Sequence, residues 1–141
     1  MAQASAATDI PVPPDQVWQF IGGFGSLPDW LPDIASSKLS EGGRVRRLAS
    51  PGGDTVVERL VAFDHAARNY SYAILQAPFP VTDYLSTLRV RETNGGTGSR
   101  VEWSGRFTPK GVSDQEARQL FQGIYEDGLK ALAARFAPKK K

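Results

Sequence analysis

The stretch SDQEARQLFQGIYEDGLKALAARF, residues 113–136, decides the fold that we expect for this chain. Its apolar residues recur every three or four positions, which is the spacing of a helix with one buried face. They are Ala117, Leu120, Phe121, Ile124, Leu129, Leu132 and Phe136. Ser113, followed three residues later by Glu116, forms a capping box that marks the helix start. We therefore predict a long C-terminal helix that packs one face on the rest of the protein.

Gly128 lies near the middle of this apolar face. A glycine inside a helix costs about 1 kcal/mol relative to alanine. Either another group approaches the helix closely at this point or a space is left open beside it. The alternative is a glycine that the helix simply tolerates.

Upstream of the helix, period-two patterns bounded by glycine-rich turns predict antiparallel strands. We expect strands at residues 2–10, 34–40, 44–49, 55–63, 69–76, 83–92 and 100–108, and two short helices between the first two strands, one from Pro14 and one at 27–31. Several antiparallel strands with one long terminal helix form an α+β pattern. The sheet should curl around that helix, because one helix has to cover one face.

The composition is that of one ordinary globular domain, residues 1–141, with 137–141 expected to be a disordered basic tail. A net charge of +2 is too small to favour nucleic acid. With no cysteine and a single histidine, we expect no thiolate chemistry, no metal site and no cofactor. No run of about 18 apolar residues suggests a membrane span. We expect a cytoplasmic protein that is a monomer or a weak dimer.

The turn at residues 50–54 sets the register of one hairpin. If the hairpin is centred on Gly52-Gly53, Arg47 lies opposite Glu58 and both face the interior, while Arg46 and Arg59 share the solvent face. The alternative is a surface ion pair between Arg47 and Glu58, worth under about 1 kcal/mol.

Tyrosines define the inner face of the next two strands, because the alternating arginines prefer solvent. Tyr72, Ile74, Tyr84 and Ser86 then point inward. This interior is rich in hydroxyl groups, which need hydrogen-bond partners when buried. In the last strand, apolar content turns Trp103 inward, whereas the opposite parity turns Glu102 inward. The sequence leaves both open.

The expected elements follow the order of one strand, two short helices, several strands and a long helix. This order resembles the helix-grip fold of the SRPBCC superfamily. That superfamily includes the birch pollen allergen, START lipid-transfer domains and polyketide cyclase/dehydrase-like proteins. Val17-Trp18, Trp30-Leu31-Pro32, residues 42–48 and Val101-Glu102-Trp103 carry the resemblance, which is to the polyketide cyclase/dehydrase-like branch. It implies a cavity between the curved sheet and the C-terminal helix, closed by the short helices.

The chain is also similar, more distantly, to the plant abscisic-acid receptors from the hairpin onward. This resemblance puts the receptors' gate loop on residues 50–54 and their latch loop on residues 78–81. It places six residues on cavity-lining positions: Arg47, Glu58, Tyr72, Ile74, Tyr84 and Ser86. It would also turn Glu102 inward. The receptors' hormone-binding lysine has no counterpart, since Asp29 and Trp30 stand there, so hormone recognition does not carry over.

We therefore expect a protein that binds a small hydrophobic molecule, such as a lipid, polyketide or aromatic acid, with an acidic or carbonyl group that meets Arg47. The expected ligand-binding residues are Trp30, Leu31, Arg47, Val56, Glu58, Tyr72, Ile74, Phe79, Tyr84, Ser86, Trp103, Leu120, Phe121, Ile124, Tyr125 and Gly128. On the long helix, Leu120, Ile124 and Gly128 would line the cavity, while Leu129, Leu132 and Phe136 would close its far end.

Two other functions remain open. One is a polyketide cyclase, dehydratase or hydrolase in which Glu58 or Tyr84 is the base and Arg47 polarises a carbonyl group. The other is an interaction module that signals through the 50–54 and 77–82 loops. Phe79 would then be an exposed contact, instead of folding over the cavity mouth.

Overall fold

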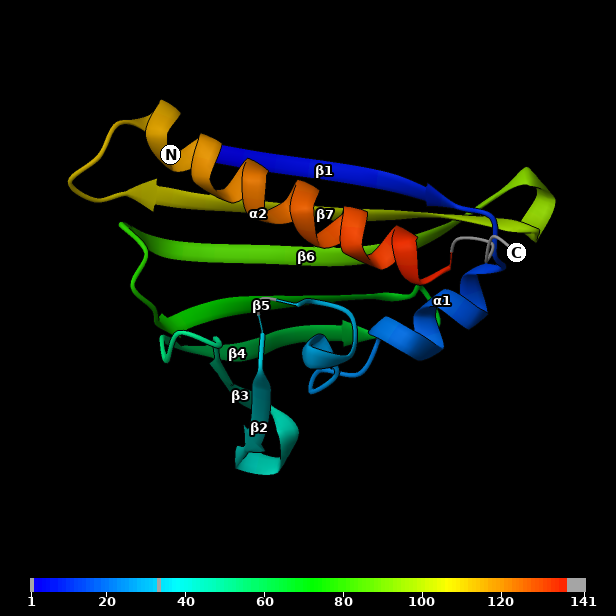
Figure 1. Cartoon of the computed structure of the whole chain (residues 1–141), viewed down its shortest axis with the longest axis horizontal. Coiled ribbons are helices and arrows are strands. Elements are labelled where there is room, and N and C mark those ends of the chain that lie inside the picture. The colour runs from blue at the N-terminus through cyan, green and yellow to red at the C-terminus, as the bar shows by residue number, and fades with distance from the viewer. Residues whose placement is uncertain (1, 33, 137–141) are drawn as a thin grey trace.

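The described part of the chain, residues 2–32 and 34–136 of a computed structural model, forms one curved sheet of seven strands with a long helix across it (Figure 1). The strands are β1 (Ala2–Ile10), β2 (Ser36–Ser40), β3 (Val45–Ala49), β4 (Thr55–Asp64), β5 (Asn69–Gln76), β6 (Val81–Thr93) and β7 (Gly98–Pro109). Their spatial order is β1-β7-β6-β5-β4-β3-β2, and every neighbouring pair is antiparallel. The tail expected at 137–141 lies outside the described residues.

Two short helical segments follow β1, as the sequence predicted. The first is α1 (Pro14–Ile21), and the second is a single 3-10 turn, η1 (Leu27–Asp29). Together with the sheet and the long helix α2 (Asp114–Arg135) they give the helix-grip α+β fold. Within the described ranges, no helix is both long enough and apolar enough to cross a lipid bilayer.

Helix α2 begins at the predicted capping box. The Ser113 hydroxyl accepts a hydrogen bond from the Glu116 N–H at 3.1 Å, and the Glu116 carboxylate accepts one from the Ser113 N–H at 3.3 Å. The buried residues of the helix are Ala117, Phe121, Tyr125, Gly128, Leu129 and Leu132. Leu120 is 38% exposed, so the buried stripe runs through Tyr125 instead.

The β3–β4 hairpin has a different register from the predicted one. Arg46 lies opposite Glu58, and Arg47 lies opposite Val57. The loop of residues 50–54 is centred on Gly52, and hydrogen bonds from the Ser50 N–H to the Asp54 carbonyl and from the Gly53 N–H to the Ser50 carbonyl hold it. Because side chains alternate along a strand, this slip of one residue exchanges the faces of two arginines. Arg46 is buried and Arg47 is exposed, so the predicted inward position of Arg47 is wrong.

The remaining inward faces agree with the apolar pattern. Tyr72, Tyr84 and Ser86 are buried, as predicted. In β7, Trp103 is 5% exposed, whereas Glu102 lies on the outer face and binds Arg91 at 2.6 Å. The apolar content therefore decides the parity of this strand, and the parity implied by the plant receptors is wrong.

Candidate ligand-binding site

A cavity of about 90 Å³ lies between the sheet and α2. Its lining comes from α2, from strands β3 to β7 and from the segments around η1 and before β6. The lining residues are Leu27, Leu31, Ile34, Leu48, Val56, Glu58, Tyr72, Ile74, Phe79, Tyr84, Trp103, Phe121 and Ile124. Most are apolar or aromatic, and Glu58 is the one charged residue among the described residues that line it.

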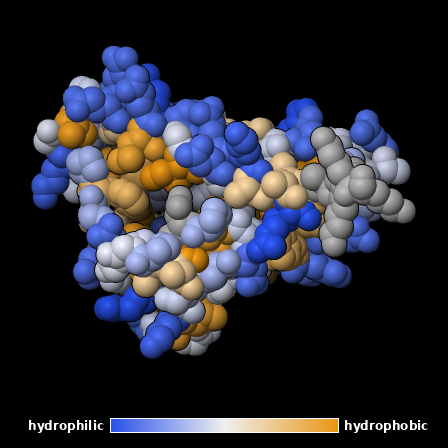
Figure 2. All heavy atoms as spheres, in the orientation of Figure 1, coloured by the Kyte–Doolittle hydropathy of each residue, from blue (hydrophilic) through white to orange (hydrophobic). Residues whose placement is uncertain are grey.

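A larger groove of about 460 Å³ runs between α2 and the segment after η1. It is lined by Leu31, Pro32, Ile34, Trp103, Gln119, Leu120, Gly123, Ile124, Asp127 and Gly128. Four residues, Leu31, Ile34, Trp103 and Ile124, line both spaces, so the groove and the cavity adjoin at these side chains. Figure 2 shows hydrophobic side chains gathered beside the first half of α2 on the face of the molecule seen there.

The structure brings most of the expected site residues to these two spaces. Ten line the cavity: Leu31, Val56, Glu58, Tyr72, Ile74, Phe79, Tyr84, Trp103, Phe121 and Ile124. Leu120 and Gly128 line only the groove. Trp30, Ser86 and Tyr125 are buried behind the lining. Trp30 packs on Trp103 with ring centroids 5.8 Å apart, and its buried Nε1 has no hydrogen-bond partner among the described residues.

The sequence analysis missed three lining residues, Leu27, Ile34 and Leu48. Leu48 shares the face of Arg46, so the correct hairpin register would have found it. Leu27 begins the η1 segment, and Ile34 follows it. The sequence pattern identified that segment, but so short a turn has no periodicity that shows which side chains face inward.

Arg46, which the sequence analysis assigned to solvent, is at the centre of a buried polar cluster. Its Nε donates to Glu58 Oε1 at 2.7 Å, and its Nη2 also lies 2.7 Å from that oxygen. Its Nη1 donates to the Phe24 carbonyl at 3.1 Å and to the Tyr70 hydroxyl at 3.3 Å. The guanidinium carbon lies 4.2 Å from the Phe24 ring centroid and 4.7 Å from that of Tyr72, within cation–π range. Arg46 therefore ties the segment after α1 to the sheet.

The environment favours a charged Arg46. Burial alone would lower the pKa of Arg46, but Tyr70, Glu58 and Tyr72 together raise it above its ordinary value. Burial raises the pKa of Glu58, and the opposing effect of Arg46 only partly offsets that rise. All three guanidinium nitrogens have partners, and Arg46 does not line the cavity. Arg46 therefore does not take over the ligand-binding role predicted for Arg47.

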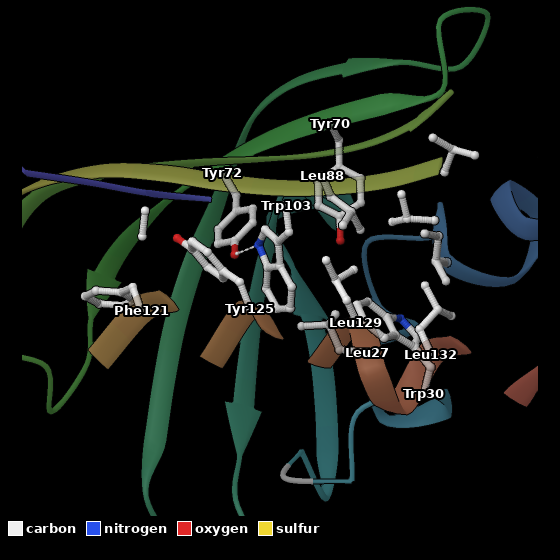
Figure 3. Packing of buried hydrophobic residues seen from close by; sticks show 14 of the residues in the cluster. Leu27, Trp30, Tyr70, Tyr72, Leu88, Trp103, Phe121, Tyr125, Leu129 and Leu132 are labelled. Carbon is white, nitrogen blue, oxygen red and sulfur yellow. Dashed lines mark hydrogen bonds between the residues drawn. The ribbon is translucent and has the colours of Figure 1, made fainter. Parts of the chain in front are cut away.

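The buried hydroxyl groups find their partners within the protein. Trp103 Nε1 donates to the Tyr72 hydroxyl at 3.0 Å (Figure 3) and to Ser86 Oγ at 3.1 Å. Ser86 Oγ donates to the Ser104 carbonyl at 2.7 Å, and the hydroxyls of Tyr84 and Tyr125 bond each other at 2.5 Å. Burial raises the pKa of Tyr125 to about 12 and those of Tyr72 and Tyr84 well above 10.0. These phenols therefore stay neutral near pH 7, where Tyr84 is a poor base.

Gly128 permits a close approach and does not leave a space open. A Cβ atom at this position would lie 2.7 Å from Trp103 Cζ3 and 2.9 Å from Leu31 Cδ2. Real Cβ atoms almost never come so near another heavy atom. The Trp103 ring thus occupies the place of a side chain at Gly128, and Figure 3 shows this ring between the sheet and α2.

Comparisons with known proteins give consistent results. The sequence matches the family described as "Polyketide cyclase / dehydrase and lipid transport" over residues 1–137. The structure is similar to that of the protein XoxI from Bacillus cereus, with 60% identity, a TM-score of 0.94 and 96% of each chain covered. It is also similar to a putative uncharacterized protein from Bacillus thuringiensis, with 58% identity, a TM-score of 0.94, and 96% of this chain and 98% of that chain covered.

More distant matches are similar in fold or in sequence. A START superfamily protein from Mycobacterium smegmatis has a TM-score of 0.78 at 15% identity, with 96% of this chain and 97% of that chain covered, which is a likeness of fold alone. An uncharacterized protein from Mycobacterium tuberculosis is 29% identical over 149 residues, which cover 94% of this chain and 97% of that protein.

Proposed function

Because the chain belongs to the polyketide cyclase/dehydrase and lipid transport family, we propose that it binds a small hydrophobic molecule between the sheet and α2. The family agrees with the SRPBCC resemblance inferred from the order of elements. The observation that carries the proposal is the apolar cavity lined by Trp103 and Phe121, which shares four lining residues with an adjoining larger groove.

The size of the two spaces suggests how a ligand is accommodated. Pockets for small molecules usually have about 300–1,000 Å³, and the cavity has only about 90 Å³. The adjoining groove has about 460 Å³. We propose that a ligand inserts one end into the cavity and leaves the rest in the groove, which requires the side chains of Leu31 and Ile124 to turn aside. Both side chains are only partly buried.

Binding is better supported than catalysis. The catalytic alternative uses Arg47 to polarise a carbonyl group, and Arg47 is on the outer face of the hairpin. It uses Tyr84 or Glu58 as the base. Burial keeps Tyr84 in its neutral form, since its pKa is raised well above 10.0. Glu58 lines the cavity, but its Oε1 is engaged by Arg46.

Native mass spectrometry of the protein purified from its own host would test the proposal. We expect a co-purifying small molecule. The variant Ile124→Phe adds volume where groove and cavity meet, so it should lose that molecule. The variant Leu75→Phe, at a position 52% exposed and outside both linings, should retain it.

Melting temperatures of both variants would show whether the loss follows unfolding. The proposal is contradicted if no molecule co-purifies and if 1-methylnaphthalene, a small apolar probe, gives no binding heat in calorimetry. It is also contradicted if the folded Ile124→Phe variant binds as well as the original protein.

A further inference from the structure

We propose that the polar end of the ligand is a hydrogen-bond donor, a hydroxyl group or a protonated amine, which Glu58 Oε2 accepts inside the cavity. This inference rests on the proposed binding function and specifies its ligand class. It reverses the expectation of an acidic or carbonyl ligand, which depended on an inward Arg47.

Glu58 offers one free carboxylate oxygen to an apolar space. Its side chain lines the cavity and the residue is 6% exposed. Both contacts from Arg46 go to Oε1. Among the hydrogen bonds of residues 2–32 and 34–136, none reaches Oε2. Oε2 is not one of the fully buried polar atoms that lack a partner, so it keeps some accessible surface at the cavity that Glu58 lines. Hydrogen bonds to charged groups are stronger than those between neutral groups, and a donor on the ligand would form one with Oε2.

Burial raises the pKa of Glu58 and Arg46 opposes that rise, and the ion pair with Arg46 at 2.7 Å favours the carboxylate form. Arg46 has no exposed surface, and a protonated Glu58 would leave its buried charge without a counter-ion. Glu58 is thus an acceptor only, since an ionised carboxylate has no proton to donate. Arg46 acts as a positioning residue, because it fixes one oxygen and leaves the other to the cavity.

An acidic ligand finds no positively charged partner among the described residues that line this cavity. The other polar side chains in the lining are Tyr72, whose hydroxyl accepts from Trp103, and Tyr84, whose hydroxyl shares one hydrogen bond with Tyr125, and both are neutral. A ligand carboxylate would also stand beside the Glu58 carboxylate. Like charges repel strongly where water is excluded. The cavity should therefore select alcohols and amines over acids of the same size.

Three probes of matched shape test this selectivity: 1-naphthalenemethanol, 1-naphthoic acid and 1-methylnaphthalene. Their dissociation constants are measured by calorimetry at pH 7, and the NMR signal of the Trp103 indole N–H reports whether each enters the cavity. We expect the alcohol to bind about tenfold more tightly than the methyl compound, a factor that corresponds to one hydrogen bond of about 1.4 kcal/mol. The acid should bind more weakly than both.

Two variants remove the carboxylate; Gln keeps a neutral acceptor oxygen, whereas Met has none. Glu58→Gln should abolish the disadvantage of the acid, although it leaves Arg46 without its partner. Arg46→Met combined with Glu58→Met removes the pair together, so it avoids a buried lone charge. In this double variant the alcohol and the methyl compound should bind within about twofold of each other.

The outcomes separate the two proposals. If all three probes bind equally to the unaltered protein, or if the acid binds best, the donor inference is overturned while the binding function stands. If none of the three binds or shifts the Trp103 signal, the donor inference is overturned, and the binding function is overturned with it when no molecule co-purifies either. If the double variant keeps the tenfold preference for the alcohol, Glu58 is not the acceptor and the inference is wrong.

Discussion

At the β3–β4 side of the cavity two opposite charges are buried against each other, whereas at the side formed by β6, β7 and α2 the buried polar atoms are neutral. The first side holds Arg46 and Glu58, which contact each other at 2.7 Å. The second side holds Trp103, Tyr84 and Tyr125, whose N–H and O–H groups bond to neighbouring hydroxyls. The first arrangement places a charge beside the cavity, and the second provides a fixed aromatic wall.

The difference lies in what remains when one member of each group is removed. Loss of one ion leaves an uncompensated buried charge, which is expensive. Loss of one hydroxyl group leaves a neutral group with one partner fewer, which costs less. The stability of the fold should therefore be more sensitive to single changes at the charged side. Three changes test this ranking.

The largest expected effect is that of Arg46→Ala. It leaves the Glu58 carboxylate buried without its counter-ion and cuts the link to the Phe24 carbonyl. Breaking a buried ion pair in this way typically costs about 3–5 kcal/mol. Urea unfolding followed by circular dichroism would measure the loss.

Arg47→Ala is the matched control, because Arg47 is the next residue and is exposed. It should change the free energy of unfolding by no more than about 0.5 kcal/mol. Equal losses for the two variants would contradict the register in which Arg46 lies opposite Glu58, and a larger loss for Arg47→Ala would restore the register expected from the sequence.

These two arginines show what a sequence pattern can and cannot predict. The strands, both short helical segments and α2 follow from hydrophobic period, turn residues and a capping box, which are local properties. The hairpin register depends on whether the loop is centred on one residue or between two, and the glycine-rich stretch around Gly52 is compatible with both. Charge alone then favours the wrong answer, because Arg46 is stabilised by partners on Phe24, Glu58 and Tyr70 that are distant in sequence.

Trp103 and Gly128 show the same limit on the neutral side. Apolar alternation correctly turned Trp103 inward, and the glycine marked an unusual point on α2. The sequence could not show that Trp103 and Gly128 contact each other, since the two residues lie on different elements. The contact depends on how α2 lies across β7.

Alkaline titration should produce the second-largest effect, on the neutral side. Burial raises the pKa of Tyr125 to about 12 from its ordinary 10.0. The folded protein therefore holds this proton more tightly than the unfolded chain does. The resulting stability is fully present below pH 10 and is lost as the pH rises through 12. The difference between the folded and unfolded pKa values of Tyr125 corresponds to about 3 kcal/mol of unfolding free energy.

Urea unfolding at pH 9, 11 and 12 would measure this loss, and Tyr125→Phe would identify its source. The variant lacks the ionisable group, so its free energy of unfolding should fall less steeply with pH than that of the original protein. A residual slope from Tyr72 and Tyr84, whose pKa values are also raised, should remain. Identical slopes for both proteins would show that Tyr125 is not held neutral by the fold.

The smallest effect is expected for Gly128→Ala, which brings a methyl group against Trp103 and Leu31. Overpacking of this kind typically costs about 1–3 kcal/mol, and the better helix propensity of alanine returns about 1 kcal/mol. We expect a net loss of about 1 kcal/mol in chemical unfolding. The indole N–H signal of Trp103 should shift, because the ring must move away from α2.

Gly123→Ala provides the control within the same helix. Gly123 also lines the groove, but a Cβ atom there would meet nothing within 4 Å. Only the higher helix propensity of alanine affects this variant, so its free energy of unfolding should rise by up to about 1 kcal/mol. The Trp103 indole N–H signal should stay unchanged. A loss of stability in Gly128→Ala together with a gain in Gly123→Ala would show that close packing against Gly128 stabilises the neutral side. If both variants gain stability, the Trp103 ring can move away from α2 at little cost, and the close packing at Gly128 does not stabilise the fold.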